Sequence, residues 1–217
     1  MKLLVFGASG GCGSWVVRLA AERGWSVTAF VREPTPYSPP AGVRVVRGDV
    51  LNAAQLAAVV PDHDVILSCV GAQRISPGNP WSLLKSPPDF CVNSAAQIIG
   101  AASAAGVSRI GAISAAGVGD SAAALPAVMR VLLAKSNIGV MYRDLGQMES
   151  AYEASGLEWF AVRPVSLINA EPSRRAHILR RFGNFSVIGR ADVAQWMLDA
   201  IAAPARPSQR RPMIGWW

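Results

Sequence analysis

Four glycines fall within seven residues near the start of the chain, in the segment GASGGCG of residues 7–13. An apolar run typical of a buried strand comes directly before this segment, and a helical pattern follows it. In such a setting Gly7 lets the chain turn sharply, Gly10 lets the backbone approach a pyrophosphate, and Gly13 lets the helix pack against the sheet. The helix N-terminus also favours an anion. The spacing therefore predicts a dinucleotide-binding turn, with a tight turn that holds no ligand as the alternative.

The residue that follows the second apolar run bears on the choice of dinucleotide. Folds that bind NAD place an acidic residue there, on the adenosine ribose, whereas this chain has Arg32. A guanidinium can pair with a 2′-phosphate, so Arg32 favours NADP, while the neighbouring Glu33 keeps NAD possible. An ordinary solvated loop arginine is the alternative. Asp49, after the third run, is positioned either to flank the adenine or to cap a nearby helix.

Apolar runs and helical patterns alternate along the whole chain. The expected strands are residues 2–6, 26–31, 43–47, 64–69, 108–114 and 158–162, with short strands near Val187 and at 213–215. The expected helices are residues 14–23, a helix from Asn52, and residues 90–105, 125–135, 141–154 and 191–202. This order predicts an α/β fold: a single Rossmann-type doubly wound parallel sheet with helices on both faces. Residues 1–217 would form one NAD(P)-binding domain, with a small substrate-side segment at about 165–217.

Composition argues against several other classes of protein. The formal net charge of +7 comes almost wholly from arginine, which suits an anionic small molecule. Nucleic-acid binding is not expected, because the one basic cluster, at 174–181, lacks interleaved aromatic residues; it stays a weak alternative. No apolar run reaches the roughly 20 residues of a membrane helix, and the short apolar start predicts a cytoplasmic protein rather than an exported one.

Metal and hydrolytic chemistry find no support in the motifs. The three cysteines have neither metal-ligand spacing nor a CxxC pair, so we expect no metal site and no disulfide framework. The chain has no HExxH motif and no paired-carboxylate pattern. Cys12 stands at a helix N-terminus, where a thiolate is stabilised, so a redox role competes with the simpler role of a small residue under the cofactor.

The order of several segments resembles the atypical short-chain dehydrogenase/reductase family. The segments are GASGGCG, VRE, GDV, DVILSCVGA, RIGAIS, SGLEWFAVRP and GRADVAQWML. Within the family the chain is most similar to the small NAD(P)-binding proteins grouped with biliverdin reductase B, a flavin reductase, and with NmrA-like proteins. The resemblance covers essentially the whole chain. It is specific for fold and cofactor, and it is not specific for substrate.

The resemblance implies a set of cofactor-binding positions. They are Gly7, Ser9, Gly10, Gly11, Cys12 and Gly13 in the phosphate loop, Arg32 at the adenosine phosphate, Asp49 and Val50 at the adenine, Cys69, Val70 and Gly71 where the fourth strand ends, and Ser114, Pro164 and Val165 at the nicotinamide. The segment RADVA at 190–194 matches a structural motif of the family, in which Asp192 starts a helix.

The catalytic pair departs from the family pattern. Members that reduce carbonyls carry Tyr-x-x-x-Lys, in which the lysine charge lowers the pKa of the tyrosine. Here Ser114 and Tyr142 are the implied catalytic residues, but Gly146 stands where the lysine would be. Arg143 points in another direction on a helix and is no simple replacement. Tyr142 is therefore either a proton donor or an ordinary helix aromatic.

Two functions from different classes remain. The first is an NADPH-dependent reductase that transfers hydride to a small planar or conjugated acceptor, such as a flavin, quinone, tetrapyrrole or enone, because water can supply the proton in such reactions. Residues 72–88 and 165–182 would form its pocket, and it would act as a monomer or homodimer. The alternative is a non-catalytic redox sensor of NmrA-like type, whose nicotinamide pocket would be filled by side chains such as Trp81 or Phe182.

Overall fold

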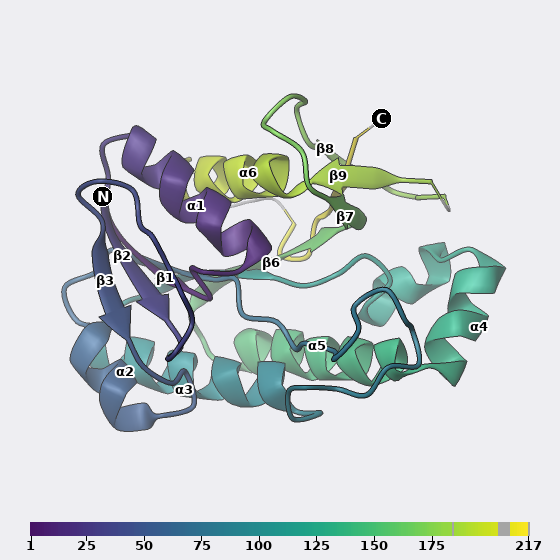
Figure 1. The fold of residues 1–217 in the computed structure, drawn as a ribbon, viewed down its shortest axis with the longest axis horizontal. Coiled ribbons are helices and arrows are strands. Elements are labelled where there is room, and N and C mark those ends of the chain that lie inside the picture. The colour runs from purple at the N-terminus through teal and green to yellow at the C-terminus, as the bar shows by residue number, and fades with distance from the viewer. Residues whose placement is uncertain (184, 204–208, 217) are drawn as a thin grey trace.

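One large sheet runs through the molecule. The computed structural model describes residues 1–183, 185–203 and 209–216, so residues 184, 204–208 and 217 of the expected C-terminal segment lie outside the described part. Eight strands form this sheet (Figure 1). In spatial order they are β3 (Arg44–Arg47), β2 (Ser26–Val31), β1 (Lys2–Phe6), β4 (Val65–Ser68), β5 (Arg109–Ile113), β6 (Glu158–Pro164), β10 (Met213–Gly215) and β8 (His177–Ile178).

The sheet is parallel except at one edge. β8 pairs antiparallel with β10, whereas every other neighbouring pair of this sheet is parallel. Two further strands, β7 (Ser166–Ile168) and β9 (Val187–Gly189), form a small parallel sheet of their own. β1 pairs with β2 on one side and with β4 on the other, so the strand order reverses at β1. In doubly wound sheets, ligands bind at such a switch point, beside the carboxyl ends of the strands.

Helices cover both faces of the sheet, as the sequence predicts. Figure 1 shows α1 and α6 together on one face, and α2, α3 and α5 on the other. A 3-10 helix, η1, and the short α4 lead into α5 beyond the end of β5. Their bounds are α1 (Gly11–Glu22), α2 (Ala53–Val59), α3 (Phe90–Ala105), η1 (Gly119–Ala124), α4 (Ala127–Lys135), α5 (Asn137–Ala154) and α6 (Arg190–Ala202).

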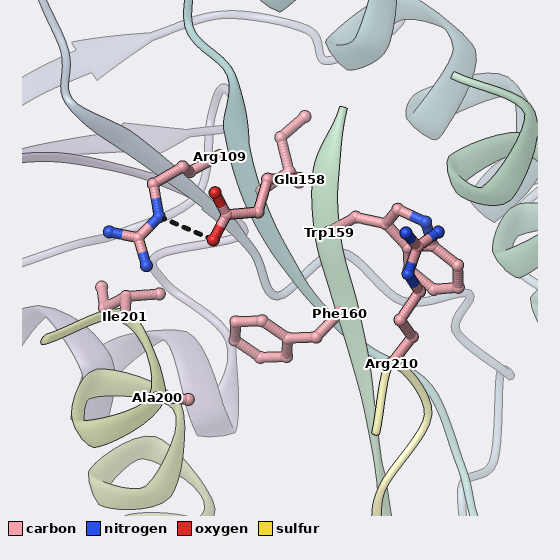
Figure 2. A pocket seen from close by; sticks show the side chains of 8 residues that line it. Arg109, Glu158, Trp159, Phe160, Ala200, Ile201 and Arg210 are labelled. Atoms are coloured by element: carbon pink, nitrogen blue, oxygen red, sulfur yellow. Dashed lines mark ion pairs between the residues drawn. The ribbon is translucent and has the colours of Figure 1, made fainter. Parts of the chain in front are cut away.

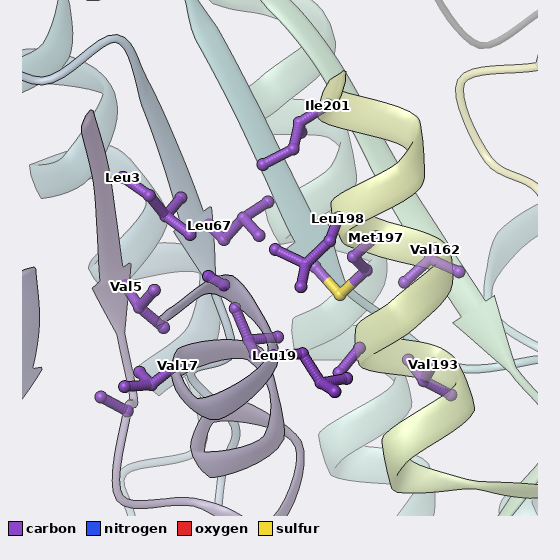
Figure 3. Packing of buried hydrophobic residues seen from close by; sticks show 14 of the residues in the cluster. Leu3, Val5, Val17, Leu19, Leu67, Val162, Val193, Met197, Leu198 and Ile201 are labelled. Carbon is purple, nitrogen blue, oxygen red and sulfur yellow. The ribbon is translucent and has the colours of Figure 1, made fainter. Parts of the chain in front are cut away.

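Alternation along β1 explains why both faces need a helical cover. Leu3 and Val5 belong to the apolar cluster under α1 and α6, and Leu4 and Phe6 belong to the cluster over α2, α3 and α5. All four side chains are fully buried. Figure 3 shows side chains of α1 and α6 converging on Leu67 of the sheet. A strand that is apolar on both faces is typical of a parallel sheet with helices on either side.

Some element boundaries differ from the sequence expectation. α1 begins at Gly11 rather than residue 14, because Gly10 is extended and its carbonyl already accepts from the amide of Ser14 at 2.9 Å. α5 begins at Asn137 rather than residue 141, and Ser136 is its N-cap. The segment after Pro164 contains β7 and β8. These strands have three and two residues, which is too short to give a recognisable pattern in the sequence. None of the described helices is long and apolar enough to cross a membrane.

Candidate functional site

A cleft of about 800 Å³ opens at the carboxyl ends of β1, β2 and β4. Nine of the predicted cofactor positions line it: Gly7, Ser9, Gly10, Arg32, Asp49, Val50, Cys69, Val70 and Gly71. These residues are far apart in the sequence. The parallel sheet brings them together because each lies shortly after the carboxyl end of β1, β2, β3 or β4. The remaining predicted positions, which do not line this cleft, are Gly11, Cys12, Gly13, Ser114, Pro164, Val165 and Tyr142.

At two positions of the loop only glycine fits, because other backbone atoms lie too close for a side chain. Gly7 has a φ of +73°, and a Cβ there would lie 2.6 Å from the carbonyl oxygen of Cys69. A Cβ on Gly13 would lie 2.1 Å from the carbonyl oxygen of Gly7. Both distances are far shorter than any real contact, so larger residues would push α1 away from the ends of β1 and β4. The roles assigned to Gly7 and Gly13 as turn and packing positions fit this geometry.

The first turn of α1 offers free amide donors to an anion. Its N-cap, Gly10, has no side chain to cap the helix, and no acidic residue stands in the first turn. The first amide that bonds back to the N-cap is that of Ser14. The preceding helix amides, together with the positive end of the helix dipole, form the kind of site that binds phosphate.

Two cations stand on the walls of the cleft. Arg32 follows β2, as predicted, and Lys85 comes from the loop of residues 72–88. Both side chains are exposed. That loop is a folded hairpin rather than a structureless one, since the amide of Ile75 donates to Leu83 at 3.0 Å and that of Lys85 to Gln73 at 2.7 Å. Sequence reasoning missed Lys85; its position in the loop after β4 was the available signal.

The alternative role of Asp49 as a helix cap is wrong. The side chain of Asn52 caps α2 by accepting from the amide of Gln55 at 3.1 Å. Asp49 instead closes a tight turn by accepting from the amide of Leu51 at 3.0 Å. Its side chain therefore stays at the wall of the cleft, beside Val50.

A second cavity, of about 490 Å³, lies beyond the carboxyl end of β5. Tyr142 and Gly146 line it from α5, and Gly117 and Gly119 line it from the segment after β5. Burial raises the pKa of Tyr142 above its ordinary value of 10, so the hydroxyl is protonated at neutral pH. Arg143 lines the same cavity, yet no cation lowers the pKa of Tyr142. The lysine effect of the family pattern is therefore not reproduced here.

Ser114 lies at the end of β5, next to the end of β6. Its amide donates to the carbonyl of Val162 at 2.7 Å, and the side chain is buried. Among the described residues its hydroxyl has no hydrogen-bond partner. Pro164 and Val165 follow on β6: the carbonyl of Pro164 accepts from Ala116 at 2.9 Å, and the amide of Val165 donates to Ile214 at 3.0 Å. These strand ends lie at the same edge of the sheet as both cavities.

A buried ion pair stabilises these strand ends. Arg163 donates to Glu149 of α5 with Nε at 2.9 Å and Nη2 at 2.6 Å, and both side chains are 3% exposed. Its Nη1 donates to Asp120 of η1 at 2.6 Å, which lowers the pKa of that carboxyl. Arg163 therefore connects β6, α5 and η1 around the second cavity. Sequence reasoning missed this network, whose members are 14 and 43 residues apart.

The cysteine of the glycine loop is a poor nucleophile. Burial raises the pKa of Cys12 to about 11, and the smaller opposing effect of Arg190 does not offset it. A thiol with this pKa is almost fully protonated at neutral pH. Of the two roles considered for Cys12, the geometry favours a small packed residue beneath the helix start over a redox thiol.

A third, much smaller cavity lies at the opposite edge of the sheet. It encloses about 40 Å³ between the starts of β5 and β6 and the end of α6. Figure 2 shows Arg109 and Glu158 paired across it, with Nε and Oε1 3.3 Å apart. It is too small for a dinucleotide and lies away from the glycine loop. Among the described residues, no group of three or more His, Cys, Asp or Glu could hold a metal ion.

Comparison with known protein families agrees with this geometry. A family model described as NAD(P)H-binding matches residues 7–204, from the first glycine of the loop to just beyond α6. The chain belongs to the NAD(P)H-binding family. Binding of a nicotinamide cofactor follows from membership, and the family fits the resemblance to atypical short-chain dehydrogenases/reductases.

Solved structures share the fold along nearly the whole chain, whereas curated sequence relatives match only a part of it. The isoflavone reductase homolog IRL of Zea mays is 33% identical over 85 residues, which is 35% of this chain and 28% of the maize protein. ChuY of Escherichia coli, described as an anaerobilin reductase, has a TM-score of 0.77 at 24% identity and covers 99% of this chain and 96% of its own. A short-chain dehydrogenase/reductase of Veillonella parvula in complex with NADP has a TM-score of 0.79 at 16% identity, with 99% and 94% covered.

Proposed function

We propose that the protein is an NADPH-dependent reductase that transfers hydride to a small planar or conjugated acceptor. The observation that carries this proposal is the pair of cavities at one edge of the sheet. The larger has the phosphate loop and two cations, and the smaller has Tyr142. Ser114 directly follows β5, and Pro164 ends β6, at the carboxyl ends of these strands. ChuY and the maize relative are both named for reductases, which supports the same class of activity.

Ser114, after β5, and Tyr142, in the second cavity, suit an acceptor that needs little acid catalysis. Bound NADPH would supply the hydride. The free hydroxyl of Ser114 would orient the carboxamide or the acceptor, because a buried hydroxyl without a partner gains a hydrogen bond when a ligand arrives. Tyr142, held protonated by burial, would be an optional proton donor. A conjugated acceptor tolerates this arrangement, since water can deliver the proton after hydride transfer.

The charges of the second cavity suggest an acidic substituent on the acceptor. Arg130 of α4 and Arg143 of α5 line it, together with apolar side chains that include Leu125 and Leu133. Neither arginine forms an ion pair among the described residues. An apolar cavity with two guanidinium groups at its wall suits a planar molecule that carries a carboxylate.

The rival role, a redox sensor with a filled nicotinamide pocket, finds less support. Trp81 is 62% exposed, and its indole N–H donates to the carbonyl of Lys135 at 3.0 Å, on the outside of the hairpin. Phe182 packs against the cluster under α1 and α6. Neither side chain lines the two cavities. An open cavity at the same end of the strands as the cofactor cleft is what an enzyme needs.

Steady-state oxidation of NADPH against a panel of flavins, quinones and enones tests the activity. We expect turnover of at least one conjugated acceptor, with NADPH preferred over NADH, and the best acceptors to carry a carboxylate. The matched control is the same panel with Ser114→Ala, in which turnover is expected to fall. Tight binding of NADPH with no oxidation in the presence of any acceptor would favour the sensor.

Arg32→Ala is expected to remove the preference for NADPH. The variant loses a charge-assisted hydrogen bond to the 2′-phosphate, so the affinity for NADPH should fall about tenfold or more, while that for NADH changes little. Calorimetric titration with both cofactors measures this. Arg44→Ala is the control, because Arg44 is an exposed arginine at the amino end of β3, away from the carboxyl ends that form the cleft. Unchanged affinities in Arg32→Ala would make Arg32 an ordinary loop residue.

A further inference from the structure

The side chain of Arg190 lies over the glycine loop. Arg190 is the first residue of α6, and a Cβ on Gly11 would come within 2.8 Å of both its Cδ and its Nε. Its Nη1 donates to the side-chain oxygen of Asn169 at 2.7 Å. α1 and α6 lie side by side on the same face of the sheet (Figures 1 and 3). The C-terminal part of the chain therefore holds a guanidinium against the first turn of α1.

This guanidinium stands where a helix repels a cation. The N-terminus of a helix carries a partial positive charge, so a neighbouring arginine is unfavourable unless an anion compensates both. The first turn of α1 has no acidic residue. Within the described part of the chain, Arg190 has no carboxylate partner, and Asn169 is neutral. The charge is felt inside the turn, since Arg190 opposes the burial that raises the pKa of Cys12.

An anion held between the helix and Arg190 resolves this conflict. The Arg190 side chain lies close to the free amides of the first turn, because its Nε would be 2.8 Å from a Cβ on Gly11. The diphosphate of a dinucleotide is the anion that a strand–glycine turn–helix unit binds. A guanidinium is well matched to phosphate oxygens, because its donors form a rigid fork.

We propose that Arg190 is a cofactor-binding residue that donates to the diphosphate, and that residue 11 is glycine to leave room for the Arg190 side chain. The proposal rests on the nicotinamide cofactor of the proposed function and adds a contact from the C-terminal segment. With this proposal the RADVA segment gains a role in cofactor binding, whereas the family resemblance implies only a structural role for it. Arg190 and Arg32 then bind different phosphates. Arg190 binds the diphosphate, which NAD and NADP share, and Arg32 binds the 2′-phosphate of NADP.

Two fragments of the cofactor separate these contacts. ADP-ribose has the diphosphate and lacks the 2′-phosphate, whereas adenosine 2′-monophosphate has only the latter. In calorimetric titrations, Arg190→Gln is expected to lower the affinity for ADP-ribose and for NADPH about tenfold. The affinity for adenosine 2′-monophosphate is expected to stay unchanged. The melting temperature without ligand is expected not to fall, because the substitution removes a repulsion.

Arg18→Gln is the matched control. Arg18 lies on α1, about two turns after Gly11, and is paired with Glu22 at 3.0 Å, so the variant loses the same charge away from the first turn. Its affinities are expected to stay at the wild-type values. An affinity of Arg190→Gln for ADP-ribose within twofold of wild type would overturn the proposal, as would an equal loss for adenosine 2′-monophosphate. If the wild-type protein binds neither NADPH nor ADP-ribose, the proposed function itself fails, and Arg190 loses its role with it.

Gly11→Ala tests the same contact without changing any charge. The added methyl group displaces the stem of Arg190, so the affinity for ADP-ribose should fall several-fold in a protein that has Arg190. In an Arg190→Ala background the same change should have little effect, because alanine ends at Cβ and leaves the space of the arginine Cδ and Nε empty. This double-mutant cycle isolates the interaction. Fully additive losses would show that Gly11 acts independently of Arg190 and would contradict the second half of the proposal.

Discussion

Glu149→Gln is expected to lower the free energy of unfolding by about 3 kcal/mol. Glu149 and Arg163 are both 3% exposed, and two hydrogen bonds of 2.9 and 2.6 Å join them. Removing the carboxylate leaves a buried guanidinium with only Asp120, whose side chain is 81% exposed, as its anionic partner. For a chain of this size the melting temperature should fall by about 6–12 °C. Urea unfolding and calorimetry measure both quantities.

Glu153→Gln is the control for that substitution. Glu153 is on the same helix and pairs with Arg211 at 2.6 Å, but its side chain is 58% exposed. Solvent screens such a pair, so we expect a change below about 1 kcal/mol. Equal effects of the two substitutions would contradict the view that burial of the Arg163 pair makes it important. The distinction matters for function because Arg163 precedes Pro164 at the edge of the candidate active site.

Gly13→Ala is expected to reduce the affinity for NADPH about 100-fold, through loss of about two charge-assisted hydrogen bonds from α1 to phosphate. The new Cβ would lie 2.1 Å from the carbonyl oxygen of Gly7, which is backbone and cannot swing away. The helix must therefore shift relative to β1, and its free amides move with it. Titration calorimetry, well below the melting temperature of the variant, measures the loss.

Gly100→Ala is the matched control for Gly13→Ala. Gly100 is in α3, and a Cβ there would meet nothing within 4 Å. Alanine also favours a helix interior, so this variant should be at least as stable as the wild type and bind NADPH equally well. A folded Gly13→Ala protein with wild-type affinity would mean that α1 does not need its close approach to the turn in order to bind the cofactor.

Local patterns made most of the fold predictable. The strand, glycine turn and helix at the start are each determined by neighbouring residues, and the expected strand 2–6 matches β1. The expected helix 90–105 matches α3, because Gly106 at a φ of +73° ends it. The start of α1 was misplaced because glycines carry no helix signal, although their backbone continues the helix back to Gly11.

The less predictable parts of the site depend on contacts between distant segments. The ion pairs of Arg163 join β6, α5 and η1, and no spacing rule connects these segments. Arg190 reaches Gly11 only because α6 packs beside α1. Lys85 enters the cleft through a hairpin whose pairing involves backbone atoms rather than a side-chain pattern. The single domain of residues 1–217 and the roles of Ser114 and Tyr142 stay predictions.

The most direct test of the account is a single-turnover measurement of hydride transfer. NADPH deuterated at C4 on either face is bound to the protein and mixed with the best acceptor of the panel, and its oxidation is followed by absorbance. Because hydride leaves from one face of a nicotinamide held in a fixed orientation, one of the two deuterated forms should react more slowly than unlabelled NADPH, and the other should react at the unlabelled rate. Equal rates for all three, or no oxidation of bound NADPH by any acceptor, would contradict the assignment of this protein as a reductase.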